Sequence, residues 1–112
     1  MSSASLPPER NSGRTLVTVC TYNERENITR LIPMILEALP DADILVVDDN
    51  SPDGTAQVAR DFGRTDPRVL LLLRPAKAGL GAATLAGLKW AIENGYEFVL
   101  NMDADFSHHP RH

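Results

Sequence analysis

The chain has 112 residues, a formal net charge of −4, 43% apolar residues and 5% aromatic residues, which are ordinary values for one small globular domain. Because an acidic chain with few aromatic side chains has no basic surface for phosphates, we exclude nucleic-acid binding. The longest aliphatic run, 69–73, is too short to cross a bilayer, and the first residues show no secretory signal. A single cysteine, Cys20, excludes an internal disulfide and favours a reducing compartment.

The N-terminal third predicts a leader, a strand and a helix. Residues 1–14 are rich in Ser and Pro and have little to bury, so we expect a disordered leader. The β-favouring run 16–20 predicts a first strand. Apolar residues at helical spacing then predict a helix over 28–39, in which Pro33 is tolerable within the first two turns.

The next unit predicts a buried strand followed by a second helix. Residues 44–47 form a continuous apolar run that is typical of a parallel strand covered on both faces. The segment 51–53, Ser-Pro-Asp, has the composition of a helix start. It predicts a helix that runs to Phe62, with Gly63 as its stop.

The rest of the chain repeats this alternation. Residues 69–73 predict a third strand, residues 81–93 a third helix that ends at Asn94-Gly95, and residues 98–102 a fourth strand. The βαβαβαβ order implies an α/β fold, a parallel sheet with helices on both faces. No helix follows the fourth strand, so we expect the front half of a larger domain, truncated there and prone to aggregate.

Acidic residues gather where the predicted strands end, which is the edge at which open parallel sheets bind ligands. Asp48 and Asp49 follow the second strand, and Asp103 and Asp105 follow the fourth. Asp103 and Asp105 would project to one side of an extended segment. Carboxylates so placed suit a hard cation such as Mg²⁺ or Mn²⁺, which could clamp a diphosphate and stabilise it as a leaving group.

Each of these signals also has a structural interpretation. One member of the Asp48-Asp49 pair could cap the next helix or brace a loop, and Asp53 is better explained as a helix-start residue than as a ligand. His108 and His109 are adjacent and would point apart, which favours surface histidines over a metal pair. Cys20 is best explained as a small buried apolar side chain.

Four motifs occur in order, at 21–28 (TYNERENI), 46–55 (VVDDNSPDGT), 74–87 (a glycine-rich segment) and 102–110 (MDADFSHHP). Together they resemble the inverting GT-A glycosyltransferases of family 2, and most closely the polyprenyl (dolichyl) phosphate mannosyltransferase branch. The resemblance covers nearly everything from Thr15 onward. It implies a Rossmann-like GT-A nucleotide-diphospho-sugar transferase fold, of which residues 15–112 would be the N-terminal half that binds the nucleotide sugar.

The resemblance also implies roles for individual residues. The nucleoside of the donor would contact Cys20, Tyr22, Glu24, Val47 and Asp49. The family usually has proline where Cys20 stands, and a backbone contact there would tolerate the change. The diphosphate would lie against the Asp-x-Asp stretch, of which the acids are the candidate catalytic residues: Asp103, Ala104 and Asp105. Asp105 and Ser107 would hold the metal, Mg²⁺ or Mn²⁺.

The reaction so implied is inverting transfer of mannose from GDP-mannose to a polyprenyl phosphate. Because the acceptor phosphate is already ionised at neutral pH, no strong general base is required. We expect a cytoplasmic protein held at the membrane surface through its lipid acceptor, with any anchoring region or subunit outside this chain, and an isolated chain that is inactive. Two alternatives stay open: another family 2 enzyme with a different donor or acceptor, and a non-catalytic α/β module that binds an ion or a partner.

Overall fold

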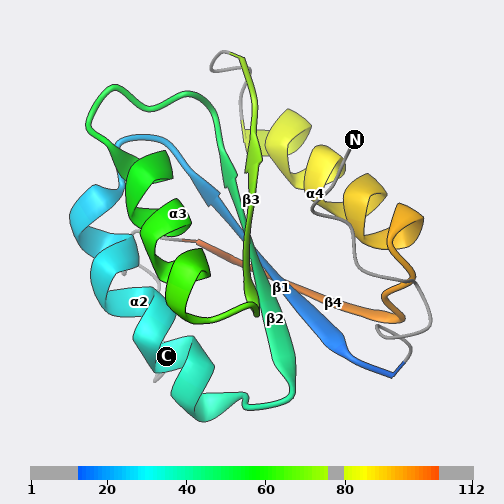
Figure 1. Ribbon diagram of the computed structural model, residues 1–112. Coiled ribbons are helices and arrows are strands. Elements are labelled where there is room, and N and C mark those ends of the chain that lie inside the picture. The colour runs from blue at the N-terminus through cyan, green and yellow to red at the C-terminus, as the bar shows by residue number, and fades with distance from the viewer. Residues whose placement is uncertain (1–12, 76–79, 104–112) are drawn as a thin grey trace, which may run out of the picture.

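A computed structural model describes residues 13–75 and 80–103, apart from the side chains of Leu80 and Asp103 (Figure 1). The strands of this part are β1 (Thr15–Thr21), β2 (Ala42–Asp48), β3 (Val69–Leu73) and β4 (Phe98–Asp103). Its helices are α2 (Arg25–Ala38), α3 (Thr55–Thr65) and α4 (Leu80–Glu93). All strand pairs are parallel and the sheet order is β3-β2-β1-β4, so the predicted α/β fold with a parallel sheet is confirmed.

The sheet is covered on both faces, with α2 and α3 on one side and α4 on the other (Figure 1). Alternate residues of β1 serve the two layers: Val17 and Val19 pack with α2 and α3, whereas Leu16 and Cys20 belong to the core under α4. The same alternation holds in β2. This two-sided burial explains why both strands are almost continuously apolar, because β1 and β2 are covered on both faces.

Helix α2 begins earlier than the sequence predicts, at Arg25, and therefore Pro33 lies in its third turn. The expectation that Pro33 falls within the first two turns is wrong. Proline is tolerated because it is exposed, on the side of the helix opposite the core residues Ile28 and Ile32. The carbonyl that loses its intrahelical donor belongs to Thr29, which is also exposed, so water can replace the lost hydrogen bond.

Helix α3 differs from its predicted bounds at both ends. It begins at Thr55 because Gly54 adopts a left-handed φ of +89° and breaks the helical path just before it. It continues to Thr65, so Gly63 lies inside the helix and is not its stop. A Cβ on Gly63 would lie 2.9 Å from the Val69 carbonyl oxygen, so glycine is needed there for the close approach of β3.

Helix α4 agrees with its prediction to within one residue and ends before Gly95, which has φ +82°. Its face toward the sheet is made of small residues, Ala83, Gly87 and Ala91. A Cβ on Gly87 would lie 3.3 Å from side-chain carbons of both Thr18 and Val47, so the helix axis runs close to the sheet. In the described residues, no helix is both long and apolar enough to cross a membrane.

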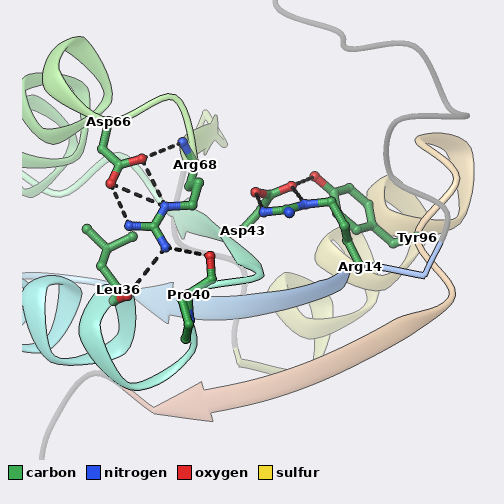
Figure 2. A network of polar contacts seen from close by, with 7 residues as sticks. All are labelled: Arg14, Leu36, Pro40, Asp43, Asp66, Arg68 and Tyr96. Carbon is green, nitrogen blue, oxygen red and sulfur yellow. Dashed lines mark hydrogen bonds and ion pairs between the residues drawn. The ribbon is translucent and has the colours of Figure 1, made fainter.

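A polar network closes the edge of the sheet at which the strands begin (Figure 2). The fully buried Asp43 accepts hydrogen bonds from Arg14 Nη2 at 2.6 Å and from the Tyr96 hydroxyl at 2.6 Å. The hydrogen bond to Asp43 raises the pKa of Arg14. Arg14 is thus part of the folded chain and not of the expected leader, whose residues 1–12 lie outside the described part.

In the second part of this network, a residue far along the chain caps the C-terminal end of helix α2 (Figure 2). Arg68 donates to the carbonyl oxygens of Leu36 and Pro40, at 3.3 Å and 3.0 Å, near the end of the helix. Asp66 holds the same guanidinium at 2.8 Å, and this hydrogen bond lowers the pKa of Asp66. Helix α2 has no basic residue in its last turn, so Arg68 supplies the positive charge that favours a helix C-terminus.

Candidate functional site

The strand ends that carry the sequence motifs lie side by side. Strand β1 stands between β2 and β4, and its register places Thr21 beside Asp48 and Cys20 beside both Val47 and Asp103. The segments that follow β1 and β2 therefore start at the same edge as the Asp-x-Asp stretch that begins at Asp103. The remaining predicted residues of that stretch, Ala104, Asp105 and Ser107, lie outside the described residues, as do His108 and His109.

Asp48 is a bracing residue of this edge. Its side chain is fully buried, and its Oδ1 accepts hydrogen bonds from the hydroxyls of Thr21 at 2.7 Å and Ser51 at 2.6 Å. Its Oδ2 accepts from the Ser51 backbone N–H at 2.9 Å. These bonds tie the end of β1 to the loop after β2, which decides the question that the sequence left open: Asp48 is the acid that braces the loop.

Asp53 performs a similar structural task at the start of α3. It accepts hydrogen bonds from the Thr55 backbone N–H at 3.0 Å, from the Thr55 hydroxyl, and from the Arg25 backbone N–H at 3.2 Å. Partial burial opposes ionisation, but these hydrogen bonds outweigh it and lower the pKa of Asp53. Asp53 thus joins the first turns of α2 and α3, as expected of a helix-start residue.

Two asparagines shape the loops behind these strand ends. Asn23 and Asn50 have φ values of +57° and +60°, in the left-handed region that asparagine tolerates better than most residues. The Asn23 backbone N–H donates to the Ser51 hydroxyl at 2.8 Å, and Asn50 Nδ2 donates to the Pro75 carbonyl at 3.2 Å. The loops after β1, β2 and β3 are therefore linked to one another by hydrogen bonds.

Tyr22 and Glu24, two of the predicted donor contacts, are half-buried in the segment after β1. Glu24 Oε2 accepts a hydrogen bond from Asn27 Nδ2 at 3.0 Å, within the first turn of α2. Glu24 also lines an open surface pocket of about 370 Å³, together with other polar residues that include Asn27 and Asp53. Glu24 is therefore held at the boundary between the strand edge and a polar hollow.

Cys20 and Val47, also predicted contacts, turn their side chains into the core below α4. Cys20 is 8% exposed, with its Sγ 3.8 Å from Thr84 Oγ1. Val47 is fully buried against the close approach of Gly87. Any ligand at this edge would meet these two residues through their backbone, which is the kind of contact already expected at position 20.

Asp49 is held differently from its neighbour Asp48. It is only 4% exposed, and its backbone N–H donates to the Thr21 carbonyl at 3.2 Å. Its Oδ1 lies 3.6 Å from Nη1 of Arg74, the residue directly after β3. The sequence placed Arg74 in a family motif but assigned it no role. The sequence places Arg74 at the end of a predicted strand, which is a signal for a residue of the site. That Arg74 faces Asp49 is seen only in the structure, where β3 lies next to β2.

The described side chains at this edge do not form a site for a hard divalent cation by themselves. Among the described residues, no group of three or more His, Cys, Asp or Glu side chains could hold a metal. The carboxylates of Asp48 and Asp53 already accept hydrogen bonds from neighbouring N–H and O–H groups. Strand β4 ends at Asp103, which is paired with Cys20 of β1, and the rest of the Asp-x-Asp stretch lies outside the described residues. Carboxylate oxygens are donors that suit Mg²⁺ or Mn²⁺.

Comparison with known proteins identifies relatives along almost the whole chain. The model of the family Glycosyl transferase family 2 matches residues 16–112. The chain is 46% identical over 119 residues to the polyprenol monophosphomannose synthase of Mycolicibacterium smegmatis, covering 95% of this chain and 45% of that protein. It is 45% identical over 97 residues to the undecaprenyl-phosphate mannosyltransferase of Micrococcus luteus, covering 87% and 40%. The chain thus spans less than half the length of these two relatives.

A solved structure resembles the fold as well. The mannosyltransferase PcManGT from Pyrobaculum calidifontis, in complex with GDP-Man and Mn²⁺, matches with a TM-score of 0.71 and 30% sequence identity. The match covers 90% of this chain and 30% of that chain. The likeness therefore extends over nearly all the elements described above.

Proposed function

Since the chain belongs to glycosyl transferase family 2, we propose that residues 15–112 form the nucleotide-sugar-binding half of an inverting mannosyltransferase. Its proposed reaction is transfer of mannose from GDP-mannose to a polyprenyl or dolichyl phosphate. The observation that carries this proposal is the convergence of three strand ends in the order β2-β1-β4, with Asp49, Tyr22 and Asp103 at one edge. Identities of 46% and 45% to two proteins named for this chemistry support the choice of donor sugar and acceptor.

In this proposal the edge is divided between the nucleoside and the diphosphate. Tyr22, Glu24 and Asp49 contact the nucleoside with their side chains, whereas Cys20 and Val47 contact it through their backbone. Asp49 is assigned this role because Asp48 and Asp53 are engaged in bracing loops and helix starts. The diphosphate lies against Asp103, Ala104 and Asp105, the segment that leaves β4 at the same edge.

We assign the divalent cation, Mg²⁺ or Mn²⁺, to Asp105 and Ser107. When bound, such a cation neutralises negative charge on a departing diphosphate. The similarity to a structure described as a complex with GDP-Man and Mn²⁺ supports the assignment. It also explains how an acidic strand edge accommodates an anionic sugar nucleotide, because without a cation the carboxylates and the diphosphate would repel one another.

The proposed transfer is an in-line displacement at the anomeric carbon of mannose. An oxygen of the acceptor phosphate forms the new bond to that carbon, while the bond to the donor diphosphate breaks and GDP leaves with the electron pair. Attack from the face opposite the leaving group inverts the configuration. The phosphate acceptor is an anion at neutral pH, so the chain need not supply a strong base. Because the acceptor is a lipid, we place the protein peripherally at the cytoplasmic membrane surface.

The test is nucleotide binding and transfer by the complete gene product, with the 112-residue chain measured alongside it. GDP in the presence of Mn²⁺ should raise the melting temperature, and UDP should not, since a ligand at 100 times its Kd stabilises by about 2.7 kcal/mol. The complete product should transfer labelled mannose from GDP-mannose to a polyprenyl phosphate, and the 112-residue chain should not.

Two results would redirect the proposal. Stabilisation by UDP and not by GDP would indicate a family 2 enzyme with another donor. The variant Asp105→Ala should lose Mn²⁺-dependent nucleotide binding without a comparable loss of thermal stability. Binding that is unchanged in this variant would favour a non-catalytic module.

A further inference from the structure

We propose that Arg74 is a positioning residue for donor recognition, which holds the Asp49 carboxylate where it accepts hydrogen bonds from the N–H groups of the nucleobase. The inference rests on the proposed function, because it takes Asp49 as the nucleoside contact. Arg74 directly follows β3, whereas the predicted donor contacts lie in or after β1, β2 and β4. The feature that the pair would recognise is a base edge rich in N–H donors.

The two neighbouring acids at the end of β2 have separate tasks. Asp48 accepts hydrogen bonds from two hydroxyls and one backbone N–H, all from residues that shape the loops. The Asp49 carboxylate instead faces a guanidinium, with Oδ1 3.6 Å from Arg74 Nη1. Asp48 therefore shapes the loops, whereas the Asp49 carboxylate lies next to the Arg74 guanidinium.

Arg74 is anchored so that its side chain starts from a fixed point. Its backbone N–H donates to the Asp48 carbonyl at 2.7 Å, which extends the pairing of β2 and β3 beyond the last residue of β3. Asn50 Nδ2 donates to the carbonyl of Pro75, the next residue, at 3.2 Å. Two hydrogen bonds thus hold both sides of the residue to the loop that carries Asp49, so little ordering would remain to be done when a ligand binds.

The ion pair between Arg74 and Asp49 is largely buried, which strengthens the attraction between the two charges. The side chains of Arg74 and Asp49 are 18% and 6% exposed, and Nη1 of Arg74 has no hydrogen-bond acceptor within the described residues. A buried guanidinium donor is costly unless a nearby charge compensates it, and Asp49 supplies that charge. The same proximity restrains Asp49, because rotating the carboxylate away would leave the guanidinium without its counter-charge.

The chemistry of an ionised carboxylate selects the ligand. Asp49 can only accept hydrogen bonds, so it complements a base edge that presents N–H donors. Guanine presents two adjacent donors, N1–H and its exocyclic amine, on one edge. Adenine presents an acceptor at N1, which a carboxylate repels. A carboxylate held in place by Arg74 therefore favours guanine nucleotides over adenine nucleotides.

A double-mutant cycle on the complete gene product tests this proposal through the Kd of GDP and of ADP. Arg74→Met should weaken GDP binding about 10-fold or more, as expected when the hydrogen bond from the nucleobase to the Asp49 carboxylate is lost, and should reduce the preference for GDP over ADP. Arg74→Lys should retain part of the affinity because it keeps the charge. In an Asp49→Asn background, Arg74→Met should have little further effect, because Arg74 acts through Asp49.

Arg68→Met is the matched control. Arg68 is also a partly exposed arginine paired with an aspartate, at 2.8 Å from Asp66, but it lies at the opposite edge of the sheet. Its replacement should lower thermal stability and leave the Kd of GDP unchanged. If Arg74→Met does not fold, as judged by circular dichroism, Arg74→Lys and Arg68→Lys provide the same comparison.

Three results would overturn the proposal. GDP affinity that is unchanged by Arg74→Met, while Asp49→Asn weakens it, would show that Arg74 does not position Asp49. Equal effects of Arg74→Met with and without Asp49→Asn would show that Arg74 acts independently. An equal loss of affinity in Arg68→Met would show that the effect is a general loss of stability. Failure of the unsubstituted protein to bind GDP with Mn²⁺ would instead refute the proposed function on which the inference rests.

Discussion

Replacement of Asp48 by alanine should destabilise the protein by disconnecting the loops at the carboxyl edge of the sheet. Asp48 is fully buried and accepts hydrogen bonds from the hydroxyls of Thr21 and Ser51 and from the Ser51 N–H. A hydrogen bond to a charged group contributes about 1.5–3 kcal/mol, and orphaned buried donors add a desolvation cost. Both hydroxyls can find other partners, since Thr21 Oγ1 already lies 3.3 Å from the Val47 carbonyl. We therefore expect a loss of about 3–4 kcal/mol of the free energy of unfolding.

Asp48→Asn should be much milder than Asp48→Ala. Its amide oxygen can face the Ser51 N–H, which can only donate, while its NH₂ group faces the two hydroxyls, which can rotate to accept. The shape is preserved and only the charge is lost, so the cost should be about 1–2 kcal/mol. The two substitutions together separate the effect of lost hydrogen bonds from the effect of lost charge.

Urea denaturation of the complete gene product provides the measurement, with the midpoint and the slope followed together. Asp61→Ala is the control, because Asp61 forms an exposed pair with Arg64 and should contribute no more than about 1 kcal/mol. A loss below about 1 kcal/mol in Asp48→Ala would refute the bracing role. Equal losses in Asp48→Ala and Asp48→Asn would show that charge, and not hydrogen bonding, holds the loops.

Gly63→Ala should lower the free energy of unfolding by about 1–3 kcal/mol in the same urea assay, because its new Cβ would lie 2.9 Å from the Val69 carbonyl oxygen, and an unchanged or higher urea midpoint would contradict this. Tyr96→Phe removes a 2.6 Å hydrogen bond to the buried Asp43 and should cost about 1.5–3 kcal/mol in the same assay; a loss of only a few tenths would show that this bond is not needed. The hydrogen bond from Arg68 lowers the pKa of Asp66. The stabilisation from this pair is therefore fully present above the unfolded pKa of about 3.9, and it is lost as pH falls through the lower folded pKa. Acid unfolding curves should therefore fall less steeply below about pH 4 in Asp66→Asn, and superimposable curves would count against the pair.

The sequence alone predicted the alternation of elements, the parallel sheet and the family, because these depend on local patterns. Continuous apolar runs mark strands that are covered on both faces, and helical spacing marks the stripe that packs on them. The run 69–73 is strand β3 without any change of bounds, and helix α4 begins one residue before its predicted start. The four motifs also bring the candidate site to the strand ends, since parallel strands share one carboxyl edge.

The tertiary structure decided the structural tasks of the neighbouring acids at the end of β2. Asp48 and Asp49 are neighbours of the same type, and only the hydrogen bonds of the surrounding loops separate the bracing acid from the one that faces Arg74. The local sequence predicts Gly63 as a helix stop, but glycine is required there because β3 approaches the helix closely. Each of these outcomes depends on groups from different strands or helices coming within hydrogen-bond or contact distance, and spacing along the chain carries no information about that distance.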